Sequence, residues 1–95
     1  MPYAYVYIVT NRRYGTLYVG VTNNLIRRAD EHRRGAIAGF SKEHRLHRLV
    51  WYEPHEWIVA AIEREKRIKR WHRDWKINLI QSFNPGWADL YPLLF

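Results

Sequence analysis

Glu65 departs from the pattern of the residues around it. Residues 56–72 have helical periodicity, and one side of the expected helix carries Ile58, Ala61, Ile62, Glu65, Ile68 and Lys69. A carboxylate on an apolar stripe is unfavourable unless an arginine, hydrogen-bond donors or a metal ion compensates its charge. Glu65 is therefore a candidate metal ligand, with a solvated stripe edge or a structural ion pair as the alternatives. Glu63 falls elsewhere, on the face that we expect to be solvated.

Tyr7 and Tyr18 are a second pair of candidates. Residues 3–10 and 16–21 alternate as strands do, and the NRRYG segment between them favours a turn. In a tight hairpin the aliphatic faces of both strands lie on one side of the sheet, so Tyr7 and Tyr18 share the other side. Such a face can serve packing or base stacking. As a base, a tyrosine with a pKa of about 10 needs a nearby cation, or a role limited to orienting water.

Arg28 and His32 stand one helical turn apart. Thr22, Asn23 or Asn24 can cap a helix that runs to about Arg34 and stops at Gly35, with an apolar stripe of Leu25, Ile26 and Ala29. Arg28 and His32 fall on a neighbouring strip, where they could clamp a phosphate or simply face solvent beside Asp30 and Glu31. The remaining histidines match no familiar zinc-ligand spacing.

The elements that must position these residues follow from the same patterns. Residues 35–47 are predicted to be a polar loop, and residues 48–53 a short strand ended by Pro54. Helices are expected at about 56–72 and 74–83, and the apolar tail should pack back on the body. The predicted order is β-β-α-β-α-α: an α+β fold with a small three-stranded antiparallel sheet flanked by helices. Residues 1–95 are expected to form one domain.

Charge limits the class of partner. Sixteen Lys and Arg against nine Asp and Glu give a net charge of +7, which favours polyanions such as nucleic acids, with a soluble basic domain or a binder of anionic proteins as the alternatives. The chain has no cysteine, which is compatible with a reducing cytoplasm. We expect no signal peptide, and no apolar run approaches the roughly 20 residues of a membrane helix.

Short motifs connect these candidates. Tyr5-Val6-Tyr7, with Tyr5 where a glycine often stands, and Tyr18-Val19-Gly20 look like the two name-giving motifs of the GIY-YIG nucleases. The segments TNNLIRRADEH and AIEREKRIKRW, and Asn84 in NPGW, are similar to the later motifs of that family. Nearly the whole chain resembles its short single-domain bacterial members, the UPF0213 group among them.

The resemblance implies an endonuclease that hydrolyses DNA with Mg²⁺ or Mn²⁺. We expect no small-molecule cofactor, and we expect the protein in the cytoplasm. The resemblance also implies that Glu65 holds the metal, Arg28 stabilises charge on the phosphate, and Tyr7 or Tyr18 activates water. His32 would assist as a base or a phosphate contact, and Asn84 matches the family's late asparagine. Candidates for contacts with the DNA backbone are Arg12, Arg13, Lys42, Arg45 and Arg48.

The substrate form, single-stranded or branched DNA among others, stays open, as do protein partners and a role in repair or recombination. Two alternatives remain. One is a binding module of the same fold that no longer cuts, and the other is a protein adaptor that uses the aromatic surface.

Overall fold

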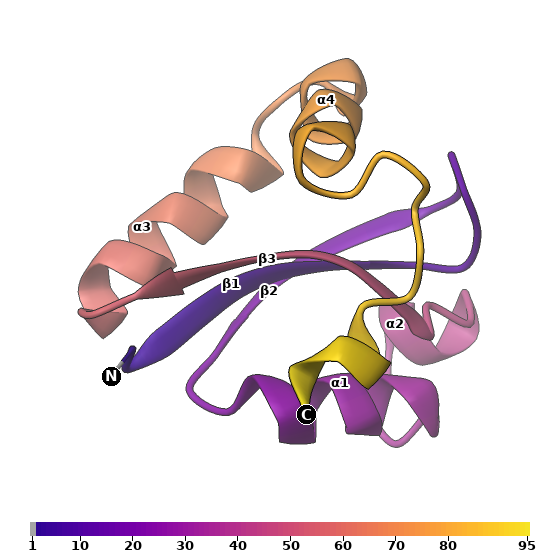
Figure 1. The fold of residues 1–95 in the computed structure, drawn as a ribbon, viewed down its shortest axis with the longest axis horizontal. Coiled ribbons are helices and arrows are strands. Elements are labelled where there is room, and N and C mark those ends of the chain that lie inside the picture. The colour runs from indigo at the N-terminus through magenta and orange to yellow at the C-terminus, as the bar shows by residue number, and fades with distance from the viewer. Residues whose placement is uncertain (1) are drawn as a thin grey trace.

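A three-stranded antiparallel sheet runs through the middle of the computed structural model, which describes residues 2–95 (Figure 1). The strands are β1 (Ala4–Thr10), β2 (Leu17–Thr22) and β3 (Arg48–His55), arranged in the order β2-β1-β3. The helices are α1 (Leu25–Arg33), α2 (Phe40–Glu43), α3 (Ile58–Lys69) and α4 (Arg73–Phe83), followed by the 3₁₀ helix η1 (Tyr91–Leu94). The predicted fold class and order of the main elements are confirmed.

Helices cover both faces of the sheet. Figure 1 shows α3 and α4 on one side and α1, α2 and η1 on the other. The alternation of β1 divides its side chains between the two layers: Val6 and Ile8 pack with α3 and α4, whereas Tyr7 and Val9 pack with α1. Within residues 2–95, every helix is too short or too polar to cross a lipid bilayer.

The C-terminal tail packs back on the body, as predicted, and it contributes to both cores. Trp87 is completely buried in the core under α3 and α4, and Leu90 is buried in the core beside α1. The backbone N–H of Leu90 donates to the carbonyl of Leu49 at 2.8 Å, which fixes the tail along β3. The tail thereby connects the two layers.

The loop predicted for residues 35–47 is wrong in one part, because it contains the short helix α2. A single helical turn has no room for an apolar stripe, so periodicity gives no signal for it. Tertiary contacts hold it instead. The Phe40 ring stacks on Tyr18 with 6.4 Å between ring centroids, and Ser41 is buried.

The predicted end of the third strand is also wrong. β3 continues through Pro54, which pairs with Tyr5, to His55, which pairs with Ala4. Since β3 is an edge strand, the missing N–H of Pro54 need not break the sheet. The register between β1 and β3 shifts at Ile8 and Val9.

Two predicted apolar stripes are narrower than expected. Ile26 of α1 and both Ile58 and Ile62 of α3 are exposed, while Ala29, Ala61 and Ile68 are buried. Each helix contacts the sheet along one narrow side only. The rest of each predicted apolar stripe therefore stays outside the core.

Gly20 has no room for a side chain. It pairs with Tyr7 across the hairpin, and the Tyr7 side chain occupies the space where a Cβ of residue 20 would lie. A Cβ added at position 20 would stand 2.5 Å from Cζ of Tyr7, well inside van der Waals contact. The hydrogen atom at this position therefore sets how close the Tyr7 ring lies to β2.

We predict that Gly20→Ala displaces the Tyr7 ring and lowers the free energy of unfolding by about 1–3 kcal/mol, because both neighbouring layers are closely packed. Urea denaturation measures the loss, and chemical shifts of the Tyr7 ring report its displacement. Gly86→Ala is the matched control, since a Cβ at Gly86 would meet nothing within 4 Å. Equal stability of the two variants would contradict the prediction.

Candidate active site

Tyr7 and Tyr18 lie on the same face of the sheet, as the alternation predicts. In the β1–β2 register Tyr18 stands opposite Val9, two residues along from Tyr7, so both side chains point toward α1. The two ring centroids are 6.5 Å apart. Tyr7 is buried, whereas Tyr18 is partly exposed on the edge strand β2.

His32 meets Tyr7 from helix α1. The helix begins at Asn24, whose side chain accepts a hydrogen bond from the backbone N–H of Arg27 at 3.1 Å. His32 lies on the buried side with Leu25 and Ala29, and only 2% of it is exposed. Its Nε2 lies 2.9 Å from the Tyr7 hydroxyl oxygen. The alternative in which His32 faces solvent is wrong.

The imidazole of His32 is neutral at neutral pH. Burial lowers the pKa of His32 to about 4, and the positive charge of Arg28 and a smaller contribution from His47 act in the same direction. The second ring nitrogen, Nδ1, lies 2.6 Å from the hydroxyl oxygen of Ser41 in α2. Both nitrogens of His32 are therefore engaged inside the protein.

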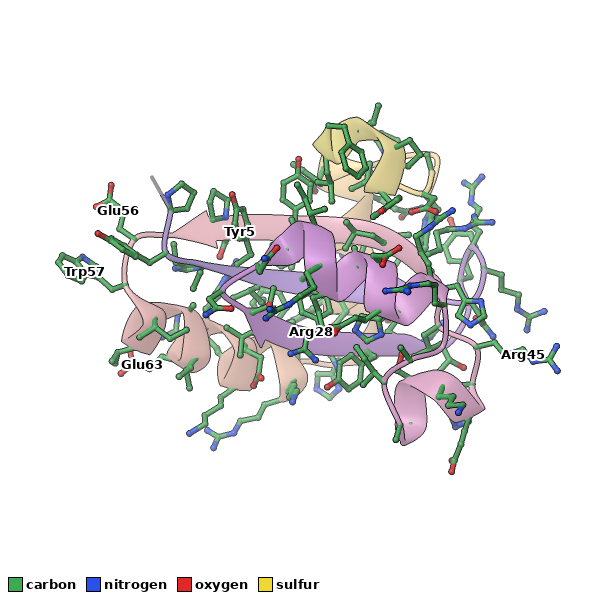
Figure 2. All side chains as sticks on the ribbon, turned by 90° about the horizontal axis from the view of Figure 1, so that it is seen from below. Tyr5, Arg28, Arg45, Glu56, Trp57 and Glu63 are labelled. Carbon is green, nitrogen blue, oxygen red and sulfur yellow. The ribbon has the colours of Figure 1, made fainter. Side chains whose placement is uncertain are left out.

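Arg28 is a residue of α1, and it lies near the centre of the face shown in Figure 2. Its side chain is 35% exposed, and its Nε lies 3.6 Å from a carboxylate oxygen of Glu31. This Nε is buried, yet no protein group within residues 2–95 accepts a hydrogen bond from it. A guanidinium with an unused buried donor is suited to bind an anion.

Glu65 reaches the same region from α3, past the free edge of β2. Its side chain is 14% exposed and lies 3.5 Å from Nζ of Lys69, one helical turn further on. Lys69 Nζ is also 5.7 Å from the centre of the Tyr18 ring. The charges of Glu65 and Arg28 both act on the hydroxyl of Tyr7. An ion pair was one of the interpretations of Glu65, and the structure contains one. Its partner, Lys69, is half exposed.

The hydroxyl of Tyr7 stays protonated in the free protein. Burial raises the pKa of Tyr7 far above its ordinary value, and the proximity of Tyr18 and the carboxylates of Glu65 and Glu31 raises it further. Arg28 acts in the opposite direction without overcoming the other causes. Tyr7 is therefore a neutral phenol in the free protein.

The residues present suit a hydrated divalent cation better than a fully protein-bound one. Within the described part of the chain, no three His, Cys, Asp or Glu side chains gather where they could hold a metal. Mg²⁺ commonly binds through one or two carboxylates and keeps several waters, and substrate phosphates complete its shell. A single, largely buried carboxylate at Glu65 fits that pattern.

Asn84 does not join this group. It follows α4, and its side-chain amide donates to the carbonyls of Val50 at 3.1 Å and Ala88 at 2.8 Å. Its side-chain oxygen accepts from the N–H of Ala88 at 3.2 Å. These bonds attach the tail to β3, at the edge of the sheet opposite β2.

The predicted DNA-contacting residues gather at the end of the sheet where β1 finishes. Arg12 and Arg13 are exposed in the β1–β2 turn, and Lys42 and Arg45 are exposed in and after α2. Figure 2 shows Arg45 far from Arg28, with Glu63 near the opposite end of the molecule. Arg48 differs from the others, because it is half-buried and donates to the carbonyl of Trp87 at 3.1 Å.

Sequence patterns missed three residues that matter to this geometry. Gly20 belongs to a recognised motif, but its contact with Tyr7 depends on the strand register. Lys69 follows Glu65 by four residues, and that spacing was the available signal for an ion pair. Ser41 lies in a segment without periodicity, so nothing in the sequence marked it.

Comparison with known proteins finds relatives over most of the chain. Residues 3–78 match the GIY-YIG catalytic domain. UPF0213 proteins of Staphylococcus aureus strains Mu50 and N315 are each 36% identical to the chain over 78 residues, which cover 82% of this chain and 94% of the relative. No solved structure matches significantly. Since these matches cover most of the sequence, the chain belongs to the GIY-YIG nuclease family, among its short UPF0213-type members.

Proposed function

We propose that this protein is a divalent-metal-dependent endonuclease that hydrolyses phosphodiester bonds in DNA. The observation that supports this most directly is the convergence at the free edge of β2. Two tyrosines, an arginine, a histidine and a glutamate come together there from β1, β2, α1 and α3. A nuclease needs groups that activate water and groups that neutralise charge on the phosphate, and this set contains both.

Glu65 would hold Mg²⁺ or Mn²⁺, with waters and a phosphate oxygen as the other ligands. When bound, such a cation lowers the pKa of coordinated water and offsets the charge that develops on the phosphate. Lys69, which contacts Glu65 in the free protein, would give up that contact and remain near the bound phosphate. A half-exposed lysine can move in this way at little cost.

Arg28 would bind the scissile phosphate. Its buried Nε has no hydrogen-bonding partner among residues 2–95, and the rest of the guanidinium reaches the partly exposed face. Charge-assisted hydrogen bonds from such a group strengthen as negative charge accumulates on the phosphate oxygens. This role needs no change in the fold, since α1 already presents the side chain beside Tyr7.

Tyr7 and Tyr18 would both act on the attacking water, each in a different way. Tyr7 is a neutral phenol in the free protein, so it orients water as a hydrogen-bonding group until bound cations favour its ionisation. Tyr18 stands at the partly exposed edge, where a substrate can reach it. His32 is too deeply buried to contact a phosphate and acts through Tyr7 instead.

The basic residues at the end of β1 would hold the DNA backbone outside the catalytic centre. Arg12, Arg13, Lys42 and Arg45 have the exposure needed for this role. We propose single-stranded or branched DNA as the substrate form, Asn84 as a support of the fold, and the cytoplasm as the location.

We predict that Glu65→Gln abolishes metal-dependent cleavage, with a loss of at least about 100-fold, while DNA binding persists. The substitution removes the charge with almost no change of volume. The free energy of unfolding should change by less than about 1 kcal/mol, because the ion pair with the half-exposed Lys69 contributes little. Cleavage of single-stranded, duplex and branched DNA, with and without Mn²⁺, measures the effect.

Glu63→Gln is the matched control. It lies two residues earlier on the same helix, is exposed, and should leave cleavage and stability unchanged. Full metal-dependent cleavage by the Glu65→Gln protein would refute the metal site. An unmodified protein that binds all three DNA forms and cuts none would instead favour the binding-module alternative.

We predict that DNA affinity falls steeply with salt, and that neutralising Lys42 and Arg45 flattens this dependence. For single strands, each contacted phosphate contributes about 0.7 to the log–log slope, so Lys42→Gln with Arg45→Gln should reduce the slope by up to about 1.4. Arg48 is left unchanged, because its bond to the Trp87 carbonyl supports the fold. Fluorescence anisotropy across a salt series measures the slope. Salt-independent binding by the unmodified protein would favour the adaptor alternative.

A further inference from the structure

Ser41 makes a buried hydrogen bond that the proposed mechanism does not yet use. Ser41 is 4% exposed, and its hydroxyl oxygen lies 2.6 Å from Nδ1 of His32. The other nitrogen of the same ring, Nε2, lies 2.9 Å from the hydroxyl oxygen of Tyr7. Ser41, His32 and Tyr7 therefore form a continuous chain of hydrogen bonds from α2 through α1 to β1.

This chain can run in either of two directions. A neutral imidazole carries one N–H, so one nitrogen donates and the other accepts. If Nδ1 carries the proton, His32 donates to Ser41 and accepts from Tyr7. If Nε2 carries it, Ser41 donates to Nδ1, and His32 donates to the oxygen of Tyr7.

The two distances favour the second direction. Hydroxyl donors typically make bonds of about 2.7–2.8 Å, whereas N–H donors typically make bonds of about 2.9–3.0 Å. The Ser41–His32 distance of 2.6 Å fits a hydroxyl donor, and the His32–Tyr7 distance of 2.9 Å fits an N–H donor.

We propose that Ser41 is a positioning residue that fixes the Nε2–H tautomer of His32 and so makes His32 a hydrogen-bond donor to Tyr7. In this arrangement Nε2 has no free lone pair, so His32 cannot take a proton from Tyr7 or from the attacking water. It supports negative charge on the Tyr7 oxygen instead. This consequence for catalysis rests on the proposed nuclease function, whereas the tautomer itself does not.

The direct test is nitrogen-15 NMR of the His32 ring in the full-length, isotopically labelled protein at pH 7, without DNA or metal. We expect a protonated Nε2 and an unprotonated Nδ1. A protonated Nδ1 in the unmodified protein would overturn the proposal. The measurement needs no cleavage, so it can succeed even where the nuclease function fails.

Variants of Ser41 test whether its hydroxyl is the cause. Ser41→Ala should give a mixture of tautomers and lower cleavage by roughly tenfold, the rate equivalent of about 1.4 kcal/mol. Ser41→Thr keeps the hydroxyl and should restore the Nε2–H tautomer. An unchanged tautomer in the Ser41→Ala protein would show that Ser41 does not set it.

Two replacements of His32 then distinguish a hydrogen-bond donor to Tyr7 from a general base at this position. The amide nitrogen of glutamine stands near the position of Nε2 and can donate to Tyr7, whereas asparagine reaches only the position of Nδ1. We expect His32→Gln to lose roughly tenfold in cleavage rate and His32→Asn more than roughly a hundredfold. Equal, large losses in both folded variants would mean that His32 acts as a base, which contradicts the proposal.

Discussion

The contact between the ring of Tyr7 and the backbone of Gly20 is the constraint on which the site depends. Tyr7 pairs with Gly20 across the hairpin, and its ring fills the space that any side chain at position 20 would need. The ring then meets His32 at a distance set by the packing of α1 on the sheet. The hydroxyl is therefore held by β1, β2 and α1 together, and its position does not depend on a flexible loop. Rigid elements of this kind hold reacting groups to closer tolerances than loops do.

The free edge of β2 explains how one site draws on both helical layers. A central strand would separate side chains above the sheet from those below it. Because β2 has no neighbour on one side, Glu65 of α3 can approach the region that Tyr18 and Arg28 occupy from the other layer. The carboxylate and the guanidinium thus both act on a buried phenol. In the free protein burial, more than either charge, raises the pKa of Tyr7 and keeps its phenol protonated, so ionisation requires added positive charge such as that of a bound cation.

Much of this arrangement follows from sequence periodicity, and its omissions have physical causes. Strand alternation placed Tyr7 and Tyr18 on one face because the side-chain period of a strand is fixed by its backbone. Helical periodicity identified Glu65 but overestimated the stripe around it, since the contact width of α3 depends on how it lies on the sheet. Pro54 suggested a strand end because a missing N–H breaks central strands, and the sequence does not reveal which strand is at the edge. Ser41 lay outside prediction altogether, because one turn of helix held by tertiary contacts leaves no local pattern.

Asn84 shows how a residue far from the Tyr7 hydroxyl can still support the elements around it. Its amide attaches the start of the tail to β3, and the tail then continues beneath the sheet. There the carboxylate of Asp89 accepts from the backbone N–H of Leu49 at 3.2 Å and forms an ion pair with Arg33 of α1. The Arg33 guanidinium also lies 4.7 Å from the centre of the Tyr91 ring. Through these contacts the tail braces the C-terminal end of α1, the helix that carries Arg28 and His32. Loss of the Asn84 amide would therefore loosen the support of the helix that presents Arg28 and His32, without touching either residue.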